Sequence, residues 1–443
     1  MKTIDFSFND SLVKGRNLKS YAKKLEGELT WMNHAAAEGY DDDRASINLP
    51  LDRKMLGTVK KAADEKRKLK PDYIVVIGIG GSNLGTIAVQ EAVLGKHYNE
   101  TGPKTKILYA ETVDPDSIKR TMDLMEKALK GKKRVILNVV SKSGTTTETM
   151  ANFQVLLGLL RKHRKDYAKY VVATTDRDSK LWKLAQKEGF TALEIPERVG
   201  GRYSVFSPVG LFPLAMLGLD IERLLKGAAS MRKRCLEKNI EDNPAAMSAA
   251  LAYHHNRKKR NINVMFVFSK DLEAVDRWYR QLMGESTGKR YNTKGKKVFE
   301  GLTPFVAVGS TDLHSVGQLF LGGPDDKFIT FVDVNRSNND VKVPRIKECA
   351  HLVENIQGRG LDEMMKAILK GVQASFRNDR RPFIDVVLPD KSEESIGQFL
   401  QYKMMEMMYL CRLLNVNPFD QPNVEDYKKE TRKILAGGRQ DRS

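Results

Sequence analysis

The stretch that decides the fold is YIVVIGIGGSNLG, residues Tyr73–Gly85. It opens with a strand-like apolar run of five residues, and four glycines follow within the next eight. This pattern predicts a buried strand that runs into a tight loop and then into a helix. Glycines let the backbone of such a loop approach a ligand, and the N-terminus of the following helix favours an anion. We therefore expect a ligand-binding loop at Gly78–Gly85.

The same loop has two other interpretations. GIGGSNLG resembles a dinucleotide-binding fingerprint, which alone is weak evidence, and Glu111 is more distant than the acidic residue that this fingerprint places about 20 positions further on. The loop also lacks the Gly-Lys-Ser/Thr ending of a P-loop. A tight turn that serves packing alone remains open at this point.

Further strand-like runs follow in two series, separated by amphipathic stretches such as Asp116–Leu129 and Thr147–Leu160. Short apolar strands that alternate with helices predict βαβ units and parallel sheets. The first series contains Lys106–Ala110, Arg134–Val140 and Tyr170–Thr175, and the second contains Val264–Ser269, Phe305–Ser310, Phe328–Val334 and Phe383–Pro389.

The predicted fold class is therefore α/β, with two αβα sandwich units and mainly parallel sheets. A chain of 443 residues is too long for one ordinary domain, which agrees with two units. We expect residues 1–50 to form an N-terminal helical segment that packs on the second unit. Residues 51–195 are expected to form the first unit. Residues 196–443 would form the second unit with its C-terminal helices, including a long amphipathic helix over Glu394–Leu414.

The composition favours a globular, cytoplasmic protein. Hydrophobic residues make up 41% of the chain and charged residues 30%, which allows a sizeable core and argues against wholesale disorder. No apolar stretch is long enough to span a bilayer, and the opening MKTIDFSFND lacks the pattern of a signal peptide. Cys235, Cys349 and Cys411 lie far apart, so neither a disulfide framework nor a zinc knuckle is expected.

The formal net charge of +19 raises the question of a nucleic-acid partner. The basic residues occur in short runs beside predicted helix ends, at Lys66–Lys70, Lys132–Arg134 and Arg257–Arg260. No basic stripe is interleaved with aromatic residues. We therefore expect solvated helix ends and no nucleic-acid partner, on a positive surface that attracts anionic substrates.

The loop Ser141–Thr149, SKSGTTTET, follows another predicted strand directly. Hydroxyls, one lysine and a helix start come together there, and a phosphate group is bound by such neutral donors, backbone amides and one positive charge. Helix capping would explain one of the hydroxyls but not the cluster. The loop is therefore a candidate phosphate site.

Four later motifs carry isolated candidate residues. Arg202 lies between glycines in GGRYSVFSPVG, where a structural salt bridge is the alternative. Glu285, in GESTGK, is predicted at a helix end and could be merely solvated. His314 lies at a predicted helix start, and NPFDQPNVEDYKKE carries Gln421 and two lysines. No HxxxH spacing occurs among the seven histidines, so no metal site is expected.

Taken in this order, the motifs resemble those of the phosphoglucose isomerase family from about Ile77 to Lys428. The resemblance implies two sugar-isomerase (SIS-type) αβα subdomains and a homodimer without membrane partners. The implied activity is the reversible isomerisation of glucose 6-phosphate and fructose 6-phosphate, in glycolysis and gluconeogenesis, with no metal or redox cofactor. The short N-terminus is similar to the compact bacterial form of the family.

The resemblance also implies roles for individual residues. Glu285 would be the catalytic base, Arg202 would lie beside the reacting carbons, and His314, donated by the partner subunit, would open the sugar ring together with Lys428. The neighbouring Lys429 is the alternative to Lys428. The residues that would hold the substrate are Gly81 and Ser82 for the sugar, Ser141, Lys142, Ser143 and Thr145 for the phosphate, and Gln421 in the wall of the site.

Two departures from the common family pattern are Thr287, where asparagine is frequent, and QPNVEDYK after the FDQ motif. Neither removes a residue assigned to chemistry. The competing functions are a related sugar-phosphate isomerase with another substrate, a non-catalytic sugar-phosphate sensor with the same fold, and a nucleotide-dependent oxidoreductase that uses the Gly78–Gly85 loop.

Overall fold

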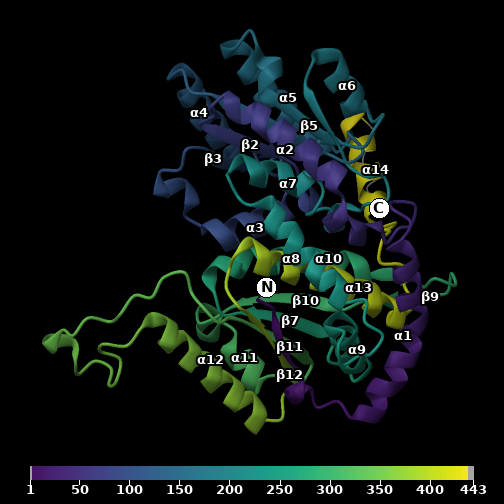
Figure 1. The fold of residues 1–443 in the computed structure, drawn as a ribbon, viewed down its shortest axis with the longest axis vertical. Coiled ribbons are helices and arrows are strands. Elements are labelled where there is room, and N and C mark those ends of the chain that lie inside the picture. The colour runs from purple at the N-terminus through teal and green to yellow at the C-terminus, as the bar shows by residue number, and fades with distance from the viewer. Residues whose placement is uncertain (1, 438–443) are drawn as a thin grey trace.

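The computed structural model describes residues 2–437 and contains two five-stranded sheets, one above the other in Figure 1. All strands of the first sheet are parallel, in the order β3-β2-β4-β5-β6. These strands are β2 Tyr73–Ile77, β3 Lys106–Ala110, β4 Val135–Val140, β5 Val171–Thr175 and β6 Thr191–Glu194. Buried parallel strands read as continuous apolar runs, and all six residues of β4 are buried.

The second sheet has the order β1-β12-β11-β7-β10, and only β1 runs antiparallel to its neighbour. Its strands are β1 Asp5–Ser7, β7 Ile262–Val267, β10 Thr303–Val308, β11 Lys327–Val334 and β12 Phe383–Leu388. A separate hairpin is formed by β8 Lys289–Tyr291 and β9 Lys297–Glu300.

Helices cover both sheets. They are α1 Gly15–Ala35, α2 Arg53–Lys68, α3 Leu84–Leu94, α4 Pro115–Lys130, α5 Thr147–His163, α6 Lys180–Glu188, α7 Pro208–Met216, α8 Ile221–Arg234, α9 Pro244–Arg257, α10 Glu273–Thr287, α11 Gly317–Gly322, α12 Leu361–Asn378, α13 Glu393–Leu414 and α14 Val424–Leu435. The predicted α/β class with mainly parallel sheets is therefore confirmed. No helix within residues 2–437 is long and apolar enough to cross a membrane.

The structure differs from the sequence predictions at strands whose formation depends on pairing with residues distant in the sequence. Residues 1–50 are not purely helical, because Asp5–Ser7 pairs with β12 at the edge of the second sheet. The strand β6 was missed because its sequence, TALE, contains no apolar run. The strands β7 and β10 each begin two residues earlier than predicted, since polar Asn263 and Thr303 join the ladder between them.

The helix α13 is buried almost all round rather than amphipathic. Nineteen of its 22 residues are buried, including the charged Lys403 and Glu406. The ammonium of Lys403 lies 3.0 Å from Glu406 Oε2, and the Tyr279 hydroxyl of α10 donates to the same oxygen at 3.1 Å. Burial lowers the pKa of Lys403 and raises the pKa of Glu406, so each charge depends on the other. This cluster fixes α10, the helix that carries Glu285.

The variant Lys403→Met should lower the free energy of unfolding by about 3–5 kcal/mol, because it leaves the Glu406 carboxylate buried without its counter-charge. Urea unfolding followed by circular dichroism measures this loss. The matched control is Lys403→Met combined with Glu406→Gln, which leaves no buried charge and should cost less than the single change. A single variant as stable as the wild type would contradict a structural role for the ion pair.

Candidate active site

The guanidinium of Arg202 lies at the centre of the candidate site and is nearly inaccessible, with 1% of its side chain exposed. Its Nε donates to Ser286 Oγ at 3.0 Å. Its Nη1 donates to Glu285 Oε2 at 3.1 Å and to Gln421 Oε1 at 2.5 Å. Its Nη2 donates to the carbonyl oxygens of Pro418 and Asp420. All five N–H donors of the group are therefore used, and they join α10 to the loop before α14.

The predicted base Glu285 lies in the last turn of α10 and keeps 32% of its side chain exposed. One carboxylate oxygen faces Arg202, and the other accepts from Gln281 Nε2 at 3.0 Å. Gln281 precedes Glu285 by four residues, so both side chains lie on one face of the helix. The carboxylate is thus held on both sides while part of it stays open to a substrate.

The glycine loop after β2 contacts the Arg202 segment directly. A Cβ atom at Gly81 would lie 2.2 Å from the carbonyl carbon of Gly201, and the Ser204 hydroxyl donates to the Gly81 carbonyl at 3.3 Å. Ser82 closes the same short turn, Gly80–Ser82. The backbone of Gly201 occupies the space against Gly81, so the close approach that the glycines permit serves protein packing. This finding weakens the dinucleotide interpretation of the loop.

The candidate phosphate loop Ser141–Thr147 follows β4, the neighbour of β2 on the side where the strand order reverses. Ligands of open α/β sheets bind at such a point, beyond the carboxyl ends of the strands. The two loops start side by side, since a Cβ atom at Gly78 would lie 3.2 Å from the carbonyl oxygen of Val140, the last residue of β4. The fold therefore brings the predicted phosphate loop and the predicted sugar loop together.

The hydroxyls of the phosphate loop are not used to cap α5, whose N-cap Thr146 makes no side-chain capping hydrogen bond. Ser141 Oγ instead lies 3.0 Å from Thr146 Oγ1, and Ser143 Oγ lies 3.0 Å from Thr145 Oγ1. Ser143 and Thr145 are exposed. Gly144 has a φ of +65° and packs on α6, which gives the loop its sharp turn.

The ammonium of Lys142 donates to the carbonyl oxygen of Glu197 at 2.5 Å. The backbone amide of Asp176 donates to the Lys142 carbonyl at 3.0 Å. Burial raises the pKa of Asp176 to about 6, and the positive charge of Lys142 opposes this rise.

Two predicted residues, His314 and Lys428, do not join the hydrogen-bond cluster around Arg202. His314 is exposed and ends the short turn Thr311–His314, three residues before α11 begins, so it does not start a helix as predicted. Lys428 lies on α14 and pairs with Glu425 at 2.7 Å. Within residues 2–437 neither side chain forms a hydrogen bond or ion pair with Arg202, Glu285 or Gln421. Lys428 is half-buried, whereas Lys429 is exposed.

One residue of the site went unassigned in the sequence. The ammonium of Lys289 is buried and donates to the backbone carbonyls of Glu285 and Asp420, both at 2.6 Å. It thereby fastens the end of α10 to the loop that carries Gln421, and burial lowers its pKa. The available signal was its spacing of four residues from Glu285, which on a helix end allows contact with that carbonyl.

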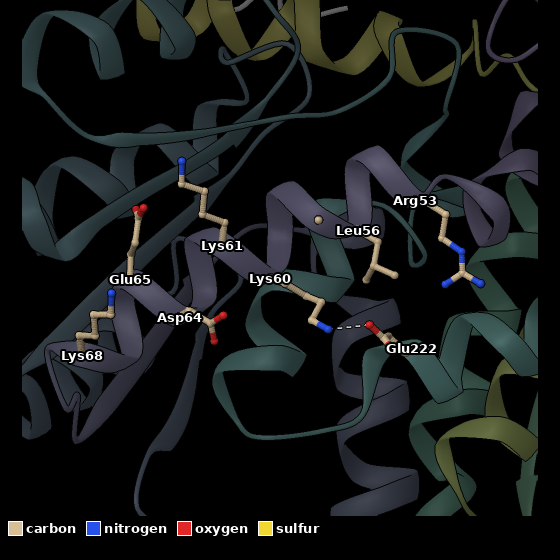
Figure 2. Close-up of a pocket in the computed structure, with 9 residues that line it drawn as sticks. Arg53, Leu56, Lys60, Lys61, Asp64, Glu65, Lys68 and Glu222 are labelled. Atoms are coloured by element: carbon tan, nitrogen blue, oxygen red, sulfur yellow. Dashed lines mark hydrogen bonds and ion pairs between the residues drawn. The ribbon is translucent and has the colours of Figure 1, made fainter.

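Of two surface hollows, one borders the Arg202 cluster and the other lies apart from it. A hollow of about 580 Å³ is lined by Lys289 and by the loop Asn417–Asp420. Another, of about 640 Å³, lies over the exposed face of α2, where Lys60 pairs with Glu222 of α8 (Figure 2). None of the predicted site residues lines this second hollow. Nor do the described residues contain a group of three His, Cys, Asp or Glu side chains placed to hold a metal ion.

Comparisons with known proteins agree on one family. The family model described as phosphoglucose isomerase matches residues 65–443. A glucose-6-phosphate isomerase of Carboxydothermus hydrogenoformans is 34% identical, over 98% of this chain and 94% of the relative. One of Rubrobacter xylanophilus is 34% identical over 97% and 98%.

Solved structures show the same fold. A hypothetical protein of Thermus thermophilus superposes with a TM-score of 0.86 at 30% identity, over 98% of this chain and all of that one. A glucose-6-phosphate isomerase of Chlamydia trachomatis superposes with a TM-score of 0.81 at 21% identity, over 98% and 88%.

The variant Gly81→Ala should destabilise the protein by about 1–3 kcal/mol, because the new methyl group would overlap the Gly201 backbone. Urea unfolding measures this loss. The matched control is Gly158→Ala in α5, where nothing lies within 4 Å of the added atom. The control should be neutral or stabilising by up to about 1 kcal/mol. Equal effects of the two substitutions would contradict the close approach at Gly81.

Proposed function

The chain belongs to the phosphoglucose isomerase family and interconverts glucose 6-phosphate and fructose 6-phosphate, a step of glycolysis and gluconeogenesis; we propose that Glu285 and Arg202 carry the proton transfer. The observation that supports these roles is the contact of 3.1 Å between a half-open carboxylate and a buried guanidinium. The pair places a base and a fixed positive charge side by side.

In the proposed proton transfer, the Glu285 carboxylate removes the proton from C2 of the open-chain aldose. The electron pair of the C2–H bond forms the C1–C2 double bond, and the π pair of the C1 carbonyl becomes a negative charge on O1. The proton of the C2 hydroxyl then passes to O1, which leaves the negative charge of the enediolate on O2. The same carboxyl group then returns its proton to C1 while O2 becomes the ketone oxygen. Hydrogen moves only within the substrate, so the reaction needs no external oxidant or reductant.

Arg202 would stabilise the negative charge of the enediolate intermediate. Its Nη1 donors face the side chains of Glu285 and Gln421. A substrate oxygen can take the place of the Gln421 amide without disturbing the three other anchors at Ser286, Pro418 and Asp420. The guanidinium can therefore serve the substrate while its position stays fixed.

The loop Ser141–Thr145 would bind the phosphate through its exposed hydroxyls, its backbone amides and Lys142. Gly81 and Ser82 would contact the sugar between this loop and Glu285. Binding at the phosphate end, remote from C1 and C2, orients the reacting carbons against the base. To reach the phosphate, the Lys142 ammonium must give up one hydrogen bond, which it donates to the Glu197 carbonyl.

Ring opening comes before proton transfer and requires an acid at the ring oxygen and a base at the anomeric hydroxyl. We assign this work to His314 and Lys428, since the pKa of histidine suits either role. His314 is exposed on the second sheet and lacks contact with Arg202, which is consistent with its donation to the site of a partner subunit. We accordingly propose a homodimer with shared active sites in the cytoplasm.

The variant Glu285→Gln should lower kcat by about 10²–10⁴-fold, because the amide cannot accept the C2 proton. The assay follows fructose 6-phosphate conversion by coupled NADPH formation with a chelator present. The contrasting variant Lys142→Met should mainly raise KM, since it removes a charge from the phosphate loop. Wild-type turnover in Glu285→Gln would exclude this base, and an unchanged KM in Lys142→Met would exclude the loop.

Mixing two inactive variants tests the shared site. Glu285→Gln and His314→Ala homodimers should both be inactive, but a hybrid dimer contains one site with a native Glu285 and a native His314 from the other subunit. Co-expression with two affinity tags isolates the hybrid, and its turnover is the measurement. Recovery of activity is expected. An inactive hybrid would show that His314 acts in its own subunit.

A further inference from the structure

Most of the excess positive charge lies in four short segments of the first sheet. They are Lys66–Asp72, Lys104–Lys106, Lys130–Arg134 and Arg161–Lys169. Together these 24 residues contain fifteen lysines and arginines against two aspartates, a net charge of +13 out of the chain's +19. Each of these four segments, taken alone, resembles an ordinary solvated helix end.

Folding brings the four segments to one surface, because each directly precedes a strand of the same parallel sheet, namely β2, β3, β4 or β5. Their contacts are direct. Arg134 Nη1 donates to the Leu69 carbonyl at 2.9 Å, and the Lys66 ammonium to the Lys169 carbonyl at 2.6 Å. The Lys106 amide donates to the Asp72 carbonyl at 2.8 Å. We call this surface the basic edge.

Helix ends explain only part of this charge. The helices α2, α4 and α5 end at the basic edge, and their dipoles favour cations in the last turn. Four basic residues there are also neutralised in ion pairs, namely Arg67 with Asp64, Lys130 with Glu126, Arg161 with Glu188, and Arg164 with Asp166.

Eight further lysines of the edge are exposed and have no ion-pair partner within residues 2–437. They are Lys68, Lys70, Lys104, Lys132, Lys133, Lys162, Lys165 and Lys169. Like charges gathered in this way repel one another and destabilise the folded chain unless a partner neutralises them. The groove of Figure 2 marks one limit of the surface, since Asp64 and Glu65 of α2 stand beside Lys68 there.

The chemistry of the edge selects the kind of partner. None of its large apolar side chains is exposed, so it offers no anchor for a lipid bilayer. Its aromatic rings at Tyr167 and Tyr170 are covered by Arg161 and Arg164, at 4.5 and 4.2 Å, so no ring is free to stack on an unpaired base. What remains is an array of ammonium groups, which contact phosphates as point charges.

We propose that the basic edge binds the phosphate backbone of double-helical nucleic acid without regard to sequence. The edge lies at the amino ends of the strands, whereas the phosphate loop of the active site follows their carboxyl ends. Since β4 has six residues, the two surfaces are separated by about 20 Å. A bound duplex therefore leaves the isomerase site accessible, and this proposal does not depend on the assigned catalytic residues.

The test measures fluorescence anisotropy of labelled 20-base-pair RNA and DNA duplexes with the full-length protein between 50 and 200 mM KCl. The edge variant carries Lys132→Gln, Lys133→Gln, Lys162→Gln and Lys165→Gln. The matched control carries Lys19→Gln, Lys23→Gln, Lys238→Gln and Lys370→Gln, four exposed lysines outside the edge that also lack ion pairs within the described part of the chain. Both variants lose the same net charge, and isomerase turnover verifies that both are folded.

The wild type should bind either duplex at low salt, with an affinity that falls steeply as salt rises. The edge variant should bind at least ten times more weakly, with a salt dependence reduced by up to about 0.9 per lost phosphate contact. The control should stay within about twofold of the wild type, since it retains the edge lysines. Equal weakening of both variants would show that net charge alone is responsible and would overturn the proposal. The absence of binding at 50 mM KCl, or binding to phosphatidylglycerol vesicles in place of duplexes, would overturn it too.

Discussion

The buried guanidinium of Arg202 is the constraint on which the active site depends. A charged group with 1% of its side chain exposed is stable only when its donors are all paired, and the five acceptors come from two distant parts of the chain. Two lie on α10, more than 80 residues away, and three lie in the loop Pro418–Gln421, more than 215 residues away. The fold must bring these segments together before Arg202 can be buried at all. Positioning Glu285, the proposed base, is therefore part of the same requirement as satisfying the arginine.

The helix α10 connects the Arg202 cluster to the protein core. Its Tyr279 hydroxyl bonds to Glu406 inside the second unit, and Gln281 and Glu285 follow on the face that meets the glycine loop. Lys289 then fastens the backbone at its end to the Gln421 loop. Rotation or sliding of α10 would break a buried ion cluster at one point and two ammonium hydrogen bonds at another. A rigid carboxylate suits the proposed proton transfer, in which Glu285 must reach both C1 and C2 without a change of position.

The sequence predicts what is local. Each strand–loop–helix unit is recognisable from its own residues, so the parallel sheets and the loops at Gly78–Gly85 and Ser141–Thr147 could be predicted. The antiparallel strand β1 could not, because Phe6 pairs with Val386 and nothing near Phe6 indicates this partner. The burial of α13 on all sides was missed because its polar residues are neutralised by each other and by neighbouring helices. The roles of Gln281 and Lys289 depend on contacts that form only once α10 meets the 417–421 loop. Ring opening by His314 and Lys428 stays a prediction, since neither side chain forms a hydrogen bond or ion pair with Arg202, Glu285 or Gln421 within the described residues.

The polarity of the parallel sheet connects the two anion-binding surfaces. Every strand points the same way, so the helix N-termini that follow the strands gather at one edge and the helix C-termini that precede them gather at the other. At the first edge, backbone N–H groups and hydroxyls can hold a small dianion with a single lysine, Lys142. At the second edge, the dipoles favour side-chain cations, and the segments before β2, β3, β4 and β5 supply far more of them than three helix ends require. The same architecture thus places the proposed compact anion site, built on the backbone, and the proposed broad one, built on lysines, at opposite edges. Because a strand's length separates them, occupation of one would not exclude occupation of the other.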